Sequence, residues 1–218
     1  MKIIHHPQPE SLMSCSAGSM PEAFAAVMAT HMSMCPDCQK NLTFLDAVGV
    51  ALFETLNATP LLRDAPVMAL RAGEADRSVL AAEFKIGNVE GDVPSPLTSV
   101  IGPALNSAPW KRVSAGVWQH VIALPATSRG DLRLIKVEPG QALPEHAHTG
   151  SELTMVLKGS YRDATGHYSV GDVADMSGGG SHSPLADPVE GCICLIATDG
   201  RLKFKGLVAR FMQPLAGF

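Results

Sequence analysis

The sequence predicts an α+β protein of two modules, a small helical bundle followed by a β-sandwich or barrel. Apolar residues recur at intervals of three and four through much of residues 1–85, as on one face of a helix. From Trp110 onward, short apolar runs alternate with turns that contain Gly or Pro, at intervals typical of a sandwich or barrel. Seven Gly and Pro residues within residues 86–109 predict a linker with little regular structure. The expected domains are therefore 1–85 and 110–218, joined by the linker 86–109.

Two helices are expected in the first module. One begins at Pro21-Glu22 and ends near His31, with Phe24, Val27, Met28 and His31 on one face. The next is longer and begins at Pro36, since proline suits the first position of a helix. Its apolar stripe, with Phe53 beside it, consists of Leu42, Leu45, Val48, Leu52 and Leu56. Residues 57–60 end it with a proline, and a further helix is expected between Val67 and Phe84.

Two runs illustrate the β texture of the second module, Leu132–Val137 and Leu153–Leu157. Both are short, rich in branched aliphatic residues and bounded by turn-forming residues. At 218 residues the chain suits one large domain or two small ones.

Composition excludes several classes of function. With 46% hydrophobic residues, the 218-residue chain is expected to bury a core and not to be disordered. The net charge of −4, with no basic stripe, argues against direct contact with nucleic acid. No apolar run reaches the roughly 18 residues of a membrane span, and the start does not resemble a secretory signal. Five cysteines, an odd number, favour metal binding and reduced thiols over a disulfide framework, so we expect a cytoplasmic protein.

The segment His31-Met-Ser-Met-Cys35-Pro-Asp-Cys38 places three possible metal ligands within eight residues. His31 and Cys35 are one helical turn apart and can face the same point. Cys35 and Cys38 lie at the start of the next helix, where free backbone N–H groups favour a thiolate. Thiolates with imidazole suit a tetrahedral zinc ion. His6 is the expected fourth ligand, and Cys15 is a weaker alternative because its surroundings suit a small core residue.

These residues resemble those of the zinc-binding anti-sigma factors, whose signature is an N-terminal histidine followed by His-x3-Cys-x2-Cys. The resemblance covers residues 1 to about 85. It implies that His6, His31, Cys35 and Cys38 bind zinc, and that the helical module clamps an alternative sigma factor and hides the surfaces it needs to reach RNA polymerase.

A second group of possible ligands lies in the β module. His146 and His148 are two residues apart on an extended segment, so both imidazoles point to the same side. Glu152 follows four residues later, and His182 can complete the set. Three imidazoles and one carboxylate suit zinc, manganese, iron or nickel, so the ligand types do not select one metal.

The residues from Gly140 to Gly159 are similar to the first motif of the cupin family, Gly-x5-His-x-His-x3-Glu-x6-Gly, at every signature position. The second cupin motif, Gly-x5-Pro-x-Gly-x2-His-x3-Asn, aligns with residues 171–186 and keeps its two glycines and His182. Ser177 and Ala186 replace its proline and asparagine. The resemblance implies a jelly-roll-like cupin barrel with a divalent metal held by His146, His148, Glu152 and His182, zinc being favoured.

Taken together, the two motifs resemble the ChrR-type zinc-binding anti-sigma factors over nearly the whole chain. That resemblance implies a one-to-one complex with an extracytoplasmic-function sigma factor, which is released when the cupin half responds to singlet oxygen or related oxidants. Helix faces around Phe24, Met28, Leu45 and Phe53 are the expected contact surface. The alternative is a metal-dependent cupin oxygenase or isomerase with a zinc-bound accessory domain, because one barrel serves many chemistries. The sparse aromatic content, two Trp and two Tyr, weakly disfavours it.

Cys192 and Cys194 flank Ile193 in an apolar run, so both thiols share one face of a strand. Small buried residues are the favoured interpretation, since free cysteine is usually part of a core. A redox pair is the alternative, but no basic neighbour in the sequence lowers a thiol pKa there.

Overall fold

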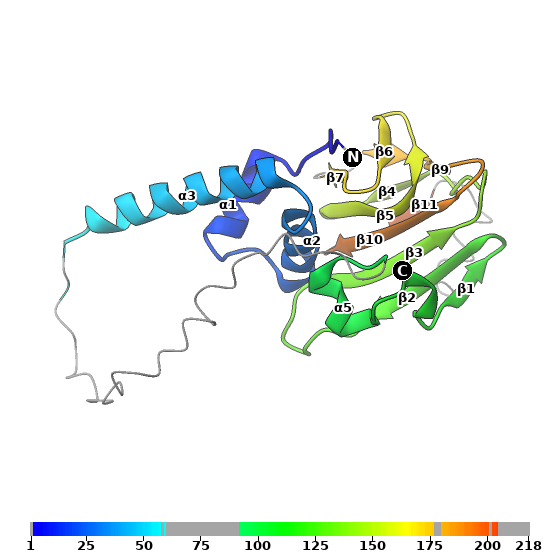
Figure 1. The fold of residues 1–218 in the computed structure, drawn as a ribbon, viewed down its shortest axis with the longest axis horizontal. Helices are drawn as coiled ribbons and strands as arrows, with labels where there is room; N and C mark the ends of the chain where they lie inside the picture. The colour runs from blue at the N-terminus through cyan, green and yellow to red at the C-terminus, as the bar shows by residue number, and fades with distance from the viewer. Residues whose placement is uncertain (1, 58, 60–91, 177–179, 201, 205–218) are drawn as a thin grey trace.

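A computed structural model describes residues 2–57, 59, 92–176, 180–200 and 202–204 (Figure 1). The helix expected between Val67 and Phe84 lies outside these residues, as do Ser177 and Gly179 of the second cupin motif. Four helices and one 3-10 turn occur in the described part: α1 (Pro9–Ser16), α2 (Glu22–Met32), α3 (Pro36–Glu54), α5 (Ser95–Ile101) and the turn Leu105–Ser107.

The described strands follow these helices in the chain. They are β1 (Lys111–Ser114), β2 (Val117–Ile122), β3 (Asp131–Val137), β4 (His146–His148), β5 (Glu152–Arg162), β6 (His167–Ser169), β7 (Val173–Met176), β8 (Ser181–His182), β9 (Leu185–Ala186), β10 (Cys192–Thr198) and β11 (Leu202–Phe204). The predicted α+β class, with helices first and a cupin-like β region second, is confirmed.

The larger sheet is built around the antiparallel strands β5 and β10. Its order is β1-β2-β3-β10-β5-β6, and β7 and β9 also pair with β5. The second sheet is short, with the order β11-β4-β8. The strand pairs described in both sheets are antiparallel, as expected for a sandwich closed by hairpins.

The two helices predicted from the sequence are confirmed as α2 and α3, each within a few residues of the expected bounds. The short helix α1 was not predicted. Pro9 occupies its first turn, which is the same signal that marks the start of α3, and Glu10 follows as a favourable first-turn acid. This pattern in Gln8-Pro9-Glu10 could have revealed it.

The prediction of a linker with little regular structure is wrong for the part of residues 86–109 that the structure describes. Pro94 and Pro96 lie at the start of α5, and Gly102, with a φ of +79°, ends it. Leu97 and Leu105 are fully buried in the main core. Proline and glycine here begin and end a packed helix, because proline suits the first turn and glycine tolerates a positive φ.

Helix α2 packs the helical part of the molecule against the β part. It contacts β10, β5, β3 and α5, and its apolar side chains belong to the same core cluster as those of the large sheet. Phe24 and Met28 are consequently buried, which contradicts their expected place on a partner-binding surface. The reason is that the sequence pattern identified an apolar helix face but not the sheet that covers it.

Helix α3 is only half covered. Leu42 and Leu45 pack against the core near α1, and Ser16 of α1 donates a hydrogen bond to Asp46 at 2.5 Å. The same face continues through Val48 and Leu52 to Leu56, which follows the C-cap of α3. All three are exposed, and the helix projects away from the rest of the molecule (Figure 1). None of the described helices is long and apolar enough to cross a lipid bilayer.

Candidate metal centres

The first candidate metal centre lies where α2 meets α3. His31 comes from the last turn of α2, Cys35 is the N-cap of α3, and Cys38 lies in the first turn of α3. His6 comes from the N-terminal arm, which we define as residues 3–8. One donor atom from each of these four residues lies within 4.8 Å of all the others. Three donors that lie close together in the sequence thus meet a histidine from a separate segment of the chain.

The donor separations match those of a tetrahedral zinc site. His31 Nε2 lies 3.2 Å from Cys38 Sγ, and His6 Nδ1 lies 3.4 Å from Cys35 Sγ and 3.3 Å from Cys38 Sγ. Zinc bond lengths of about 2.3 Å to sulfur and about 2.0 Å to nitrogen give a tetrahedral edge of about 3.5 Å. Two thiols and two imidazoles that surround one point therefore fit a zinc ion.

Electrostatics at this cluster also favours a bound cation. Burial, followed by the neighbouring Cys35 thiol, raises the pKa of Cys38 to about 12, so a thiolate here is costly without a compensating positive charge. Burial lowers the pKa of His31 to about 4 and keeps the imidazole in its neutral, metal-binding form. The carbonyl of Gly171 accepts a hydrogen bond from His31 Nδ1 at 2.9 Å, which leaves Nε2 directed at the cluster.

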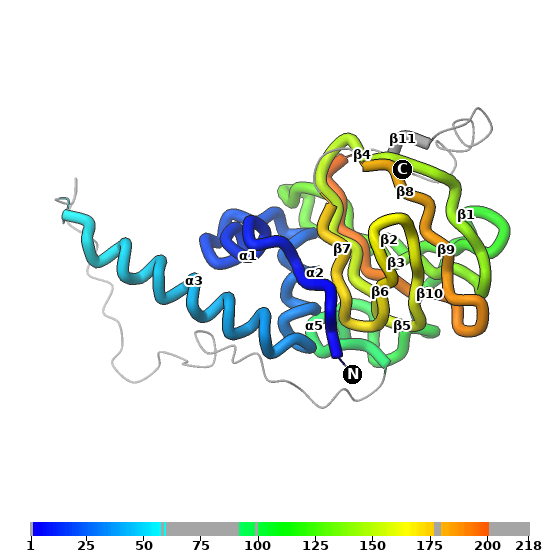
Figure 2. Tube along the Cα trace, turned by 90° about the horizontal axis from the view of Figure 1, so that it is seen from above, coloured from blue at the N-terminus to red at the C-terminus, as the bar shows by residue number. Residues whose placement is uncertain are grey.

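The arm that carries His6 is fixed to the β region. The Asp172 carboxylate accepts hydrogen bonds from the backbone N–H groups of Ile4 at 2.8 Å and His5 at 2.9 Å. Val173 N–H donates to the His5 carbonyl at 3.1 Å, so the arm runs beside β7 (Figure 2). Although burial opposes it, these backbone hydrogen bonds lower the pKa of Asp172. No pattern in the sequence indicated this role for Asp172.

The second candidate metal centre lies on the small sheet. His146 and His148 are on β4, and His182 is on β8, directly opposite His146 in the antiparallel register. All three histidines are buried. His182 Nε2 lies 2.9 Å from His146 Nε2 and 3.2 Å from His148 Nε2. Neutral imidazole nitrogens so close together need a shared proton or a cation between them, and the cluster fits a divalent metal.

The outer ring nitrogens of two of these histidines have firm partners. His146 Nδ1 donates to the Pro144 carbonyl at 2.8 Å, and His182 Nδ1 donates to the Asp163 carboxylate at 3.0 Å. Both contacts fix the tautomer that leaves Nε2 free for a metal. Burial lowers the pKa values of His146 and His148 to about 4, so both rings are neutral near pH 7. Asp163, like Asp172, was not identified from the sequence, since it belongs to neither motif.

Glu152 stands beside the histidines without joining their group of donor atoms. Its Oε2 atom lies 3.2 Å from His148 Nδ1, on the outer side of that ring, and its other oxygen accepts a hydrogen bond from Thr154 at 2.9 Å. Burial raises the pKa of the Glu152 carboxyl to about 7 against the opposing influence of Thr154 and Arg133. Its role as a fourth ligand stays a prediction.

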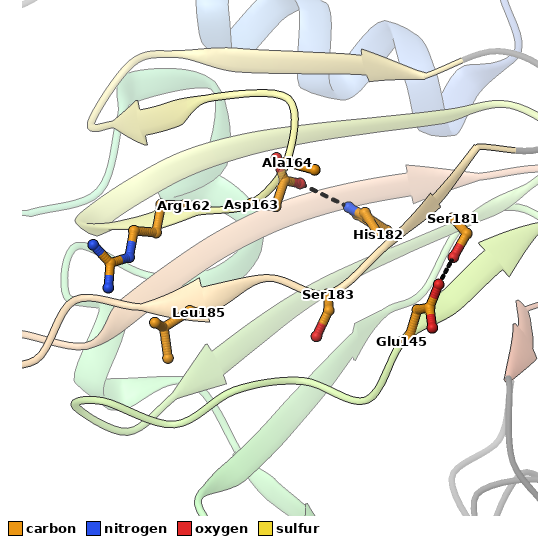
Figure 3. A pocket seen from close by; sticks show the side chains of 8 residues that line it. All are labelled: Glu145, Arg162, Asp163, Ala164, Ser181, His182, Ser183 and Leu185. Atoms are coloured by element: carbon orange, nitrogen blue, oxygen red, sulfur yellow. Dashed lines mark hydrogen bonds and ion pairs between the residues drawn. The ribbon is translucent and has the colours of Figure 1, made fainter.

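A pocket of about 450 Å³ opens beside the histidine cluster (Figure 3). Figure 3 shows His182 joined to Asp163 at this pocket, and Ser181 joined to Glu145. The lining residues are mostly polar: Glu145, Arg162, Asp163, Ala164, Ser181, His182, Ser183 and Leu185. Small polar solutes can therefore approach the outer side of His182.

The other cysteines lie outside both clusters. Cys15 lies on α1, is partly buried and is not in the donor group of the first centre. Cys192 and Cys194 are buried, with their sulfur atoms 3.2 Å apart. The contact with Cys192, followed by burial, raises the pKa of Cys194, which keeps this thiol protonated. These observations favour the interpretation of the pair as core residues.

Comparison with known proteins shows similarity over nearly the whole chain. A family model described as the ChrR cupin-like domain matches residues 100–200. The sequence is 34% identical over 214 residues to the anti-sigma-E factor ChrR of Cereibacter sphaeroides, covering 98% of each chain.

Two solved structures similar to this chain differ in how far the similarity extends. A chain of the crystal structure of Rhodobacter sphaeroides SigE in complex with the anti-sigma ChrR is 32% identical, with a TM-score of 0.71, over 91% of this chain and 100% of that chain. An RmlC-like cupin protein from Ralstonia eutropha JMP134 is 23% identical, with a TM-score of 0.41, over 47% of this chain and 69% of that chain.

Proposed function

We propose that this protein, which belongs to the ChrR family of anti-sigma factors, binds an extracytoplasmic-function sigma factor and keeps it from RNA polymerase. The solved relative similar to this chain is described as a complex of the anti-sigma ChrR with SigE. We expect the complex of this chain to contain one copy of each protein, without direct contact to nucleic acid or a membrane.

The observation that carries this proposal is the uncovered face of α3. Leu52, Phe53 and Leu56 are 64%, 74% and 69% exposed, and Val48 extends the same surface toward the covered half of the helix. Such a row of large apolar side chains at intervals of three and four is typical of a helix that lies in an apolar groove of a partner. We name Val48, Leu52, Phe53 and Leu56 the α3 patch and assign the sigma factor to it.

The α3 patch depends on the first metal centre for its position. Cys35 and Cys38 are at the base of α3, and His31 ties that base to α2. A zinc ion held there would fix the direction in which α3 projects from α2 and the barrel. The donor set of two thiols and two imidazoles favours zinc over harder cations.

We assign the response to oxidants to the second centre, and we call its three histidines, His146, His148 and His182, the cupin cluster. Its three imidazoles converge, and a solvent-accessible pocket meets the outer side of His182. An oxidant such as singlet oxygen that altered one ring or its metal would change the packing of β4 against β8. The chemistry of the cluster admits zinc, manganese, iron or nickel, and we favour zinc because a sensor of this kind needs no redox-active ion.

A reducing compartment suits this assignment. Cys35 and Cys38 serve as metal ligands only as reduced thiolates, and the other cysteines are also free. We therefore place the protein in the cytoplasm, where its proposed partner acts.

The decisive experiment mixes the purified full-length protein with an extracytoplasmic-function sigma factor from the same organism. We expect one complex on a sizing column and loss of sigma-dependent transcription when RNA polymerase is added. Singlet oxygen should then restore transcription. Free sigma factor on the column and undiminished transcription, tested across the sigma factors of that organism, would overturn the proposal.

The pocket beside His182 favours a second candidate, a cupin oxygenase or isomerase. The same preparation tests it, because an enzyme would consume oxygen or convert a substrate without the sigma factor. Sigma binding with unchanged transcription inhibition after loss of His182 would separate the anti-sigma function from any chemistry at the cupin cluster.

A further inference from the structure

One segment of the β region contacts both metal centres. We name residues 163–173, which run from the end of β5 through β6 to the start of β7, the coupling segment. Its first residue, Asp163, holds His182 of the cupin cluster, and its last residues hold the arm with His6 and the ring of His31. The two metal centres, whose ligands come from distant parts of the sequence, thus contact the same segment.

At the cupin end, the contacts form a chain of hydrogen bonds. His182 Nδ1 donates to Asp163 Oδ2 at 3.0 Å, and Thr165 donates to Asp163 Oδ1 from its hydroxyl at 2.6 Å and its backbone at 2.8 Å. The Tyr168 hydroxyl lies 3.0 Å from Thr165 Oγ1. The orientation of the His182 ring is therefore linked to the position of the Tyr168 side chain.

At the arm end, Tyr168 meets the residue next to the zinc ligand. The rings of His5 and Tyr168 are 4.3 Å apart, and His5 also rests on Gly166, where an added Cβ would lie 3.2 Å from Nε2. The His5 backbone is held on both sides, by Asp172 and Val173. Displacement of Tyr168 would shift His5. Because His6 is the next residue in the chain, its position would change as well.

We propose that the chain Asp163–Thr165–Tyr168–His5 couples the two centres, so that metal bound at the cupin cluster raises the zinc affinity of the first centre. We call this first centre, with its donors His6, His31, Cys35 and Cys38, the N-terminal cluster. A metal that fixes the His182 ring orders the coupling segment, and the ordered segment holds His6 in place for zinc at a smaller entropic cost. Coupling of this kind is reciprocal and typically changes an affinity by about fivefold or more. This inference concerns the metal centres alone and stands or falls independently of the sigma factor.

Cobalt provides a readout that is specific to the N-terminal cluster. Both centres of the full-length protein are loaded with Co²⁺, and the ratio of metal to protein is checked to be two in the wild type and one in His146→Ala. Of the two clusters, only the one with Cys35 and Cys38 contains thiols, so a cobalt–thiolate charge-transfer band at a metal-to-protein ratio of two reports on that cluster. The protein is then treated with the thiol reagent 5,5′-dithiobis(2-nitrobenzoate), without a chelator, and the loss of the band is timed.

We expect the band to disappear about fivefold faster in His146→Ala than in the wild type. Replacement of Tyr168 by Phe removes the hydroxyl that contacts Thr165 and keeps the ring over His5. In a Tyr168→Phe background the difference between the loaded and the emptied cupin cluster should fall below about twofold. Thr165→Val, at an exposed position, should have the same effect without disturbing the core.

Tyr161→Phe is the matched control. Tyr161 stacks on Tyr168 with ring centres 4.9 Å apart, but no hydrogen-bond partner of its buried hydroxyl is found among the described residues. This variant should keep the full fivefold difference. Equal rates in the wild type and His146→Ala would overturn the proposal. So would an undiminished difference in Thr165→Val, or a loss of the difference in Tyr161→Phe as large as in Tyr168→Phe.

Discussion

The two metal centres differ in what holds their ligands in place. The cupin histidines lie on β4 and β8, which pair with each other in an antiparallel sheet through backbone hydrogen bonds. The donors of the N-terminal centre come from an arm, a helix end and a helix start, which do not pair with one another as strands do; the arm is held instead by hydrogen bonds with Asp172 and Val173. We infer that metal contributes more to the stability of the first centre than to that of the second.

The largest expected effect comes from loss of a thiol at the N-terminal centre. We expect Cys38→Ser to remove one zinc per chain, to reduce the helical circular dichroism signal and to weaken sigma binding at least about a thousandfold, because structural zinc is worth on the order of 10 kcal/mol in small modules. Metal analysis, circular dichroism and a binding titration measure the three quantities. Normal helicity and binding in a zinc-free Cys38→Ser protein would contradict the comparison.

The β region should depend on its core more than on its metal. Leu195 is completely buried between β3 and β5, and we expect Leu195→Ala to lower the free energy of unfolding by about 2–5 kcal/mol. His146→Ala, which empties the cupin cluster, should lower it by less than Leu195→Ala. Urea denaturation followed by tryptophan fluorescence gives both values. A larger loss in the histidine variant would show that the metal contributes strongly to the stability of this centre too.

A charge in the α3 patch should separate binding from folding. We expect Leu52→Asp to weaken the sigma complex by about 2–4 kcal/mol, since an apolar anchor is lost and a charge is desolvated. The melting temperature should stay within a few degrees of the wild type, because Leu52 is exposed. Val189→Asp is the control, an equally severe change at an exposed position of the β region, and it should leave the affinity unchanged. Calorimetric titration of the sigma factor with each variant measures the two affinities. Equal affinities for Leu52→Asp and Val189→Asp would contradict the assignment of the partner to the α3 patch.

The smallest expected effect concerns the attachment of the arm. Asp172→Asn keeps the shape of the side chain but replaces one acceptor oxygen by a donor, which faces the N–H of Ser169 or those of Ile4 and His5. We expect a loss of about 1–2 kcal/mol in stability and a severalfold faster zinc release from the N-terminal centre. Amide hydrogen exchange over residues 3–8 should increase in parallel. Unchanged exchange there would mean that the arm is held without Asp172.

Local spacing explains which parts of these centres could be anticipated. His31, Cys35 and Cys38 lie within eight residues and must meet once α2 and α3 form. His146 and His148 share a face of any extended strand for the same reason. Asp163, Gly171 and Asp172 could not be recognised, because each acts on a residue far away in the sequence: His182, His31 and His5.

The surfaces were harder to anticipate than the ligands. An apolar stripe looks the same in sequence whether a sheet covers it, as over Phe24 and Met28, or a partner is expected to, as over Leu52 and Phe53. Proline and glycine in residues 92–107 were equally ambiguous, because they begin and end helices as readily as they break them.

Local patterns in the sequence were enough to predict the order of helical and β regions, the helices α2 and α3, and the donor types at both centres. Periodicity and short ligand spacing are local properties that survive in any fold. Long-range packing, by contrast, buries α2 against the β region, leaves the second half of α3 uncovered and places the arm with His6 beside β7. These features depend on contacts between residues more than a hundred positions apart, and no local pattern encodes them.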